Sequence, residues 1–287
     1  MGNALAQTFP SKPVRLVVGY PPGGPADLTA RLVAARLQEG WGQPVIVDNK
    51  PGASAMIGGE LVARAAPDGY TLLLGTIQSH AMNAGSIKKM LYDPARDFTP
   101  ISQLTRTNWL LAAHAGLKAA SLPELISYAK TRPGELTYGS SGVGSVSHLA
   151  FEILGASAGV RMTHVPYKGT AQAVSDVVEG RVQLVIGDQP LIAPQIKAGR
   201  LKRIAMTGDF DVLPWQGIFG PAGMPAELVR RIHGDVVTAL RSPELEKRFA
   251  AAGLEAVGST PEEFAAHVRR ELARWTDAAR KAGIQPE

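Results

Sequence analysis

The sequence predicts an α/β protein of two lobes, each a mainly parallel sheet flanked by helices, with two crossover strands joining them. Three observations predict this fold class. Short β-branched runs alternate with helical periodicity up to residue 76, and the same alternation resumes after residue 121. Extended passages near 101–113 and 210–219 separate these blocks from each other and from a helical C-terminal part.

Composition sets the size and excludes several classes of protein. The 287 residues correspond to about two domains at roughly 150 residues each. A hydrophobic content of 45% with 19% charged residues supplies sizeable cores and excludes a mainly disordered chain. No apolar run approaches the ~20 residues of a membrane span. The absence of cysteine excludes disulfides, thiolate nucleophiles and Cys-ligated zinc.

The charge balance favours a small anionic ligand over a nucleic acid. The formal net charge is +5, but the basic residues are scattered and aromatic residues make up only 6% of the chain. A groove that stacks bases needs aromatic platforms, so we expect no nucleic-acid partner. Mild positive charge suits a small anion.

The first block predicts strands at 14–20, 44–48 and 70–74, with helices at 27–40 and 57–65 between them. Parallel strands joined by helical crossovers present their carboxyl ends at one edge of the sheet. Candidate ligand-binding residues are therefore expected in the turns that follow these strands.

The second block and the C-terminal part complete the lobes. The predicted elements are helices at 122–131, 148–154 and 171–179, strands at 137–138, 162–165, 182–186 and 201–207, and terminal helices at 226–242, 243–252 and 261–282, the last capped by Thr260. We assign 9–106 with 217–287 to lobe 1 and 107–216 to lobe 2, with a ligand cleft between the lobes. Residues 1–8 are expected to be a disordered remnant of a signal peptide.

The first glycine-rich turn, Tyr20–Asp27, supplies candidate ligand-binding residues. Prolines including Pro22 stiffen it, while Gly23 and Gly24 let the backbone turn with its N–H groups outward. Asp27 is expected to cap the following helix. Bare amides at a helix start favour anions, but the turn is neither G-x-G-x-x-G nor a Walker loop, so a nucleotide site is not supported. A plain strand–helix turn is the structural alternative.

The second glycine-rich turn, Ser140–His148, repeats this pattern in the other lobe. Ser140, Ser141, Gly142 and Ser145 place hydroxyl donors and free amides between a strand and a helix. His148 either hydrogen-bonds a ligand or only caps. Two such turns suit a dicarboxylate, or a carboxylate with another polar group.

Further candidates follow other strands, where each has a purely structural alternative such as capping, backbone hydrogen bonding or a solvated surface position. These residues are Thr76, Ser79, Tyr167, Lys168, Gly169 and Asp188.

Catalysis is the alternative class of function. A serine hydrolase of a carboxylic ester would use Ser145 or Ser140 with His148, yet neither serine lies in a G-x-S-x-G elbow. The six histidines are widely spaced, which argues against a metal site, and nothing indicates a cofactor.

Ala4-Leu5-Ala6 matches the small-residue pattern at the end of a secretory signal peptide. Together with the absence of cysteine it is typical of a bacterial periplasmic protein.

Seven ordered motifs carry a family resemblance. They are Tyr20-Pro21-Pro22-Gly23-Gly24-x-x-Asp27, Asn49-Lys50-Pro51-Gly52-Ala53, Pro67-Asp68-Gly69-Tyr70-Thr71-Leu72, Tyr92-Asp93-Pro94-x-x-Asp97-Phe98, Tyr138-Gly139-Ser140-Ser141-Gly142, Val165-Pro166-Tyr167-Lys168-Gly169 and Pro221-Ala222-Gly223-Met224-Pro225. From about Phe9 to the C-terminus the chain closely resembles the Bug receptors, the periplasmic substrate-binding proteins of tripartite tricarboxylate transporters.

This resemblance implies a type II-like periplasmic binding protein whose lobes close on a carboxylated solute. It further implies that backbone amides and ordered water of the two glycine-rich turns hold the solute, with Thr76, Tyr167–Gly169 and Asp188 as further lining. The expected protein is a monomeric, non-enzymatic receptor that delivers the solute to a membrane permease. One departure is that Gly208-Asp209 alone replaces a longer family segment with a Pro-Asp-Val-Pro-Thr motif. That departure puts the edge of the second lobe in doubt.

Overall fold

The computed structural model describes residues 9–284, and the predicted signal-peptide remnant lies outside them. The chain divides into two compact units. Unit 1 contains residues 9–106, 215–251 and 255–273, and unit 2 contains 107–214, 252–254 and 274–284.

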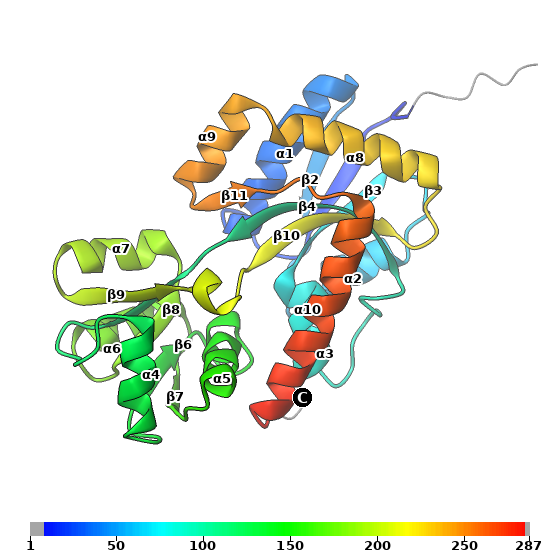
Figure 1. The fold of residues 1–287 in the computed structure, drawn as a ribbon. Coiled ribbons are helices and arrows are strands. Elements are labelled where there is room, and N and C mark those ends of the chain that lie inside the picture. The colour runs from blue at the N-terminus through cyan, green and yellow to red at the C-terminus, as the bar shows by residue number, and fades with distance from the viewer. Residues whose placement is uncertain (1–8, 285–287) are drawn as a thin grey trace, which may run out of the picture. The chain divides into compact units, whose positions relative to one another are not determined.

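Unit 1 is built on a six-stranded sheet with the order β11-β4-β10-β3-β1-β2 (Figure 1). The strands are β1 (Val14–Val18), β2 (Val45–Asn49), β3 (Thr71–Thr76), β4 (Phe98–Thr107), β10 (Trp215–Pro221) and β11 (Leu254–Ala256). Strand β1 pairs in parallel with β2 and β3, whereas β10 runs antiparallel to both β3 and β4. The carboxyl ends of β1, β2 and β3 therefore share one edge of the sheet.

Helices pack on this sheet and bury an aromatic core. They are α1 (Pro25–Trp41), α2 (Met56–Ala63), a π-helix (Gln78–Met82), α3 (Asn83–Ser86), α8 (Ala226–Leu240), α9 (Pro243–Ala251) and α10 (Pro261–Lys281), of which residues 261–273 belong to unit 1. The core includes Trp215, Phe219 and Phe264, which are almost fully buried and in mutual ring contact. Helix α10 begins where predicted: Thr260 Oγ1 accepts the Glu263 N–H, and the Glu263 carboxylate accepts the Thr260 N–H.

Unit 2 is built on a five-stranded sheet with the order β7-β6-β8-β5-β9. Its strands are β5 (Leu110–His114), β6 (Thr137–Ser140), β7 (Thr163–Pro166), β8 (Leu184–Gly187) and β9 (Leu201–Met206), and its helices are α4 (Leu122–Lys130), α5 (Val146–Ala158), α6 (Thr170–Val178), α7 (Gln189–Lys197) and a 3₁₀ turn (Thr207–Phe210). Strand β6 pairs in parallel with β7 and β8, and β5 runs antiparallel to β8 and β9.

The predicted two-lobed α/β class is confirmed, but each sheet is mixed rather than mainly parallel. The antiparallel pairs come from β10 in unit 1 and β5 in unit 2, strands that begin just after the chain passes from one unit to the other. Helix α7 was not predicted, because Pro190 and Pro194 interrupt its helical pattern. Pro190 lies in the first turn, where its missing N–H costs nothing.

The shortened connection after β9 closes into a compact turn. Asn108 Oδ1 accepts the Gly208 N–H at 2.8 Å, and Val212 donates to the Thr207 carbonyl at 2.8 Å. Strand β9 pairs antiparallel with β5 from Leu201 to Met206, with one irregularity in register. The segment absent relative to the family pattern therefore leaves the edge of the unit 2 sheet intact.

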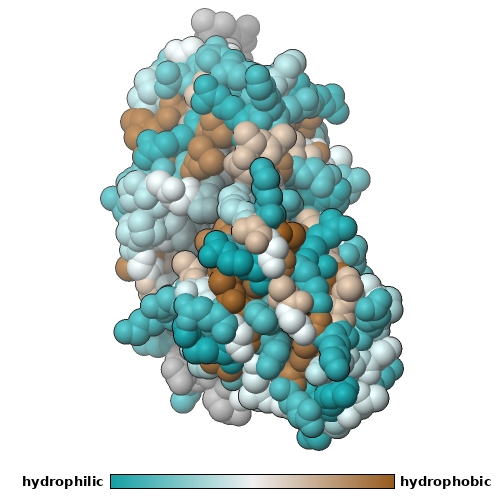
Figure 2. All heavy atoms as spheres, turned by 90° about the vertical axis from the view of Figure 1, so that its left-hand side faces the viewer, coloured by the Kyte–Doolittle hydropathy of each residue, from teal (hydrophilic) through white to brown (hydrophobic). Residues whose placement is uncertain are grey.

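Among residues 9–284, no helix is both long enough and apolar enough to span a bilayer. Figure 2 shows one face of the molecule, on which hydrophilic residues predominate and apolar ones form small separate patches.

We predict that Gly217→Ala destabilises the fold while Gly234→Ala does not. A Cβ on Gly217 would overlap the Phe264 ring and lie 2.9 Å from the Ser102 carbonyl oxygen, whereas one on Gly234, in α8, would meet nothing within 4 Å. Overpacking should cost about 1–3 kcal/mol of unfolding free energy. The helical Gly234→Ala should gain about 0.5–1 kcal/mol. Urea titrations measure both, and equal stabilities would contradict the close packing of β10 against α10.

Candidate functional site

In unit 1, the first glycine-rich turn leaves β1 and enters α1 without a side-chain cap. Gly23 has a φ of +87°, which an L side chain rarely adopts, and Pro25 lies in the first turn of the helix. Within the described part of the chain, nothing accepts the N–H groups of Gly24, Ala26 and Asp27. The turn therefore presents open amides at the positive end of a helix, which is an anion-binding arrangement.

Asp27 holds this turn from within. Its buried carboxylate accepts hydrogen bonds of 2.9 Å each from the Gly23 N–H, Arg31 Nε and Asn49 Nδ2. The hydrogen bond from Arg31 outweighs desolvation and lowers the pKa of Asp27 to about 2. Asp27 was predicted to cap α1, but Gly24 is the N-cap residue of this helix. The Asp27 carboxylate instead accepts the N–H of Gly23, which precedes the helix. The carboxylate shapes the turn through all three bonds.

Thr76, the last residue of β3, and Ser79, in the π-helix that follows, are buried and hydrogen-bonded to their surroundings. Thr76 Oγ1 lies 2.7 Å from the Tyr20 hydroxyl, and Ser79 Oγ accepts the Thr76 N–H at 3.0 Å. Tyr92 donates to the Ser79 carbonyl at 2.8 Å. Burial raises the pKa of Tyr20. The contact between Tyr20 and Thr76 joins the first glycine-rich turn to the end of β3.

The turn between β2 and α2 was not among the predicted site residues, although its Asn49–Ala53 motif was recognised. Three consecutive non-glycine residues, Ala53, Ser54 and Ala55, have φ values of 46°, 53° and 70°. Non-glycine residues in this left-handed conformation are strained, and they are found most often at functional sites. Within residues 9–284, no group accepts the N–H of Gly52, Ala53, Ser54 or Ala55. Local sequence carries no signal for this run, because these residue types do not require positive φ.

The β2–α2 turn lies against the first glycine-rich turn. A side chain on Gly19 would approach Ala55 to 2.7 Å, so glycine is needed where β1 ends. Asn49 Nδ2 also donates to the Tyr20 carbonyl at 3.0 Å. Unit 1 therefore brings two turns with open amides to one edge of its sheet.

In unit 2, the second glycine-rich turn connects β6 to α5 and folds back on its own serines. The Gly142 N–H donates to Ser140 Oγ at 3.1 Å, the Ser141 N–H donates to Ser147 Oγ at 3.1 Å, and Ser145 Oγ caps α5 by accepting the His148 N–H. Val143 is 68% exposed at its tip. Within the described chain, the N–H groups of Val143, Val146 and Ser147 have no acceptor, so this turn also offers open amides at a helix start.

The imidazoles of His148 and His164 contact this turn. His148 Nδ1 accepts the Gly144 N–H at 3.1 Å, and His164 Nε2 lies 2.6 Å from Ser140 Oγ. Their rings stack 3.8 Å apart at an interplanar angle of 8°. Burial lowers the pKa of each imidazole to about 4, so both are neutral at neutral pH.

The other predicted residues of unit 2 have structural partners. The Tyr167 hydroxyl donates to Asp176 at 2.7 Å, Gly169 is the N-cap of α6, and the Lys168 side chain is exposed. Asp188 is the N-cap position of α7, and burial raises the pKa of its carboxyl, which is hydrogen-bonded to Trp109. Only the Lys168 side chain is left open to solvent.

The serine–histidine pairings of the hydrolase alternative are not formed. Ser140 contacts His164 rather than His148, and its side chain is buried, with 1% of the residue exposed. Ser145 Oγ accepts a backbone N–H, and His148 Nδ1 is already an acceptor for Gly144. A nucleophile needs a base within hydrogen-bond reach and access to substrate, and neither serine combines the two.

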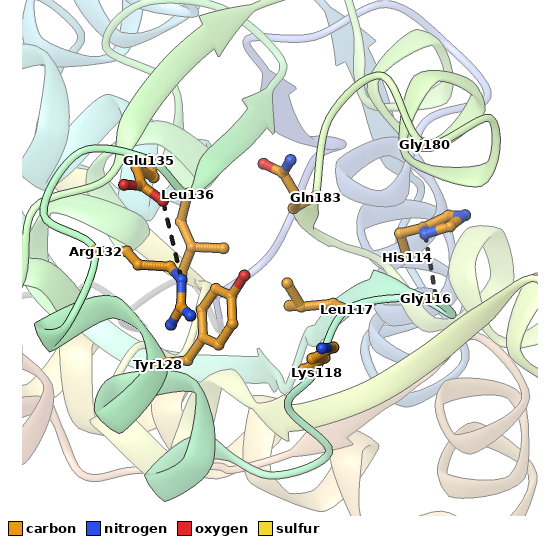
Figure 3. A pocket seen from close by; sticks show the side chains of 10 residues that line it. All are labelled: His114, Gly116, Leu117, Lys118, Tyr128, Arg132, Glu135, Leu136, Gly180 and Gln183. Atoms are coloured by element: carbon orange, nitrogen blue, oxygen red, sulfur yellow. Dashed lines mark hydrogen bonds and ion pairs between the residues drawn. The ribbon is translucent and has the colours of Figure 1, made fainter.

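A separate hollow of about 490 Å³ lies at the opposite end of the unit 2 strands, where β5 ends and where β6 and β8 begin (Figure 3). Its lining residues are His114, Gly116, Leu117, Lys118, Tyr128, Arg132, Glu135, Leu136, Gly180 and Gln183. It is apart from the glycine-rich turn, which follows the carboxyl end of β6.

Comparison with known proteins identifies the family of this chain. Residues 29–211 match the family described as tripartite tricarboxylate transporter family receptor, TctC. The chain belongs to this family. Three of the solved structures that are similar match nearly the whole of this chain. In each case the match covers 100% of the solved chain.

Rpa4515 of R. palustris, solved with adipate, is 38% identical over 97% of this chain, with a TM-score of 0.76. MatC of Rhodopseudomonas palustris, solved with bound malate, is 30% identical over 94%, with a TM-score of 0.72. The periplasmic binding protein BugD is 29% identical over 97%, with a TM-score of 0.72. The resemblance to Bug receptors is thereby confirmed, as is a fold shared with periplasmic binding proteins.

We predict that stability falls as the pH drops from 6.5 towards 4. Burial lowers the pKa of His80 to about 3 and of His148 to about 4, from an ordinary value of 6.5. Between these values the unfolded chain binds more protons than the folded one, so unfolding becomes easier by up to about 1.4 kcal/mol per pH unit for each imidazole. Asp27, with its pKa near 2, adds a loss only below 3.8.

Urea titrations across this window measure the effect, and His80→Phe provides the comparison. His80 is fully buried and stacks on Phe219 at 4.0 Å, so phenylalanine keeps the ring contact and removes the titrating group. The variant should lose less stability per pH unit than the wild type. An identical pH slope in both proteins would contradict the assignment to His80.

Proposed function

We propose that this protein is a solute receptor of a tripartite tricarboxylate transporter and binds a small carboxylated organic compound. One observation carries the proposal. In each unit a parallel strand is followed by a glycine-rich turn, and this turn has open amides where the next helix begins. Such groups bind carboxylates without a fixed cationic partner. The proposed contacts are the open N–H groups of the two turns, those of Gly24, Ala26 and Asp27 in unit 1 and of Val143, Val146 and Ser147 in unit 2.

The substrate class we propose is an acid with an apolar carbon body. Leu28 and Ile57 lie in the first turns of the helices that follow the two unit 1 turns, and they are 41% and 45% exposed. Val143, at the tip of the second glycine-rich turn, is also exposed. Apolar side chains beside amide donors suit a methylene chain between carboxylates. The adipate bound to the 38% identical Rpa4515 is a molecule of this kind.

We further propose that the protein acts in the periplasm as a monomer, binds without catalysing a reaction, and delivers its solute to a membrane permease. The family description supports a transporter partner, and the similarity to the periplasmic binding protein BugD supports export. The burial of Ser140 and the backbone contact of Ser145 support binding without ester hydrolysis.

Thermal melting against a panel of organic acids tests the proposal. Binding to the folded state raises unfolding free energy by about 2.7 kcal/mol at one hundred times Kd. We expect adipate to raise the melting temperature more than malate does, because adipate has a longer apolar carbon chain and lacks the hydroxyl of malate. If no acid in the panel raises the melting temperature, the proposed receptor function is wrong. Turnover of a carboxylic ester that Ser145→Ala abolishes would establish the hydrolase instead.

Two glycine variants separate the site from the fold. Gly142 has a φ of +125° within the second glycine-rich turn, and Gly134, also in unit 2, has a φ of +82° in the turn between α4 and β6. Alanine at either position should cost about 1 kcal/mol of stability, because both conformations are unfavourable for L side chains. Only Gly142→Ala should weaken adipate binding, by about tenfold or more. Isothermal titration calorimetry checks this, and equal affinities would contradict the placement of the site.

A further inference from the structure

We propose that His148 and His164 form a stacked imidazole clamp that fixes the backbone of the second glycine-rich turn in its ligand-binding geometry. Both are positioning residues, since each acts on the ligand through the turn. This inference rests on the proposed function and deepens it, because it assigns the groups that keep the amides of this turn in place.

His148 holds the C-terminal part of the turn. Its Nδ1 accepts the Gly144 N–H at 3.1 Å, and its own N–H donates to Ser145 Oγ at 3.3 Å. Gly144 has a φ of +73°, a conformation that the backbone adopts here with the imidazole as its partner. One histidine therefore fixes two consecutive residues of the turn.

His164, on β7, holds the N-terminal part through Ser140. Its Nε2 lies 2.6 Å from Ser140 Oγ, and the same hydroxyl accepts the Gly142 N–H and donates to the Gly142 carbonyl, each at 3.1 Å. An imidazole N–H donated to Ser140 Oγ satisfies all three contacts of this hydroxyl at once. Gly142, with its φ of +125°, is thereby tied to β7.

Stacking joins the two imidazoles into one rigid element. The rings are 3.8 Å apart and nearly parallel, and the Tyr138 ring lies 5.0 Å from His164. The Tyr138 hydroxyl donates to Glu152 at 2.6 Å, and the Phe151 ring stacks on Tyr138 at 4.2 Å. The column therefore links β6, β7 and α5, the three elements around the turn.

Core packing alone would need the rings but not their nitrogen atoms. Two pairs of variants separate these requirements. His148→Asn keeps an acceptor near the position of Nδ1, and His164→Gln keeps a polar group near Nε2. His148→Phe and His164→Phe keep the stacked rings and remove the hydrogen bonds.

The matched control is His114→Phe. His114 Nδ1 accepts the Gly116 N–H at 3.1 Å, which is the same interaction at the opposite end of the unit 2 strands. Its loss should leave the second glycine-rich turn unchanged.

Amide hydrogen exchange followed by NMR tests the clamp without ligand, and calorimetry with adipate tests its effect on binding. In His148→Phe the Gly144 amide should exchange about tenfold faster or more, and in His164→Phe the Gly142 amide should do so, since each loses the group that holds its hydrogen bond. Both variants should bind adipate about tenfold more weakly or worse. His148→Asn and His164→Gln should restore at least part of both properties.

Unchanged exchange at Gly142 and Gly144 in folded phenylalanine variants would overturn the clamp. So would affinities like those of the wild type, or equal losses in the phenylalanine and the amide variants. If the wild type binds no acid, the proposed function fails, while the exchange measurements still decide the clamp. If a phenylalanine variant does not fold, the wild type decides: a scalar coupling across Gly144 N–H···Nδ1 of His148 supports the clamp, and its absence overturns it.

Discussion

A binding surface made of backbone N–H groups is the constraint on which the site depends. An amide cannot turn towards a ligand by itself, since its direction is fixed by the φ and ψ angles of its neighbours. Each turn here contains glycines at positive φ or a left-handed run, conformations that surrounding groups must hold in place. Most of the conspicuous polar side chains near the turns therefore bind the protein itself.

The two units meet this constraint with different chemistry. In unit 1 an ionised carboxylate, Asp27, collects the Gly23 amide, Arg31 and Asn49. In unit 2 neutral groups hold the turn, because Ser140, His148 and His164 form its hydrogen bonds without a formal charge. A neutral scaffold leaves the helix start electropositive, whereas a carboxylate there needs Arg31 to balance it.

Several predicted site residues have partners within the protein, for a consistent reason. Thr76, Ser79 and Tyr167 have side chains that suit a ligand, yet the structure turns their hydroxyls towards neighbouring protein groups. Ala53–Ala55 have no polar side chain except at Ser54, so their open amides were missed. Side-chain chemistry is readable in a sequence, but the availability of a backbone group is not, because it depends on every possible acceptor nearby.

By itself the sequence determined the alternation of strands and helices, the two glycine-rich turns and the family, since these depend on local periodicity and on ordered motifs. Only the tertiary structure decided that β10 and β5 make the sheets mixed, because strand direction depends on pairing between distant segments. It likewise decided that His164 rather than His148 contacts Ser140. Stacking between β7 and α5 arises from packing across a sheet, and no spacing within a single element encodes it.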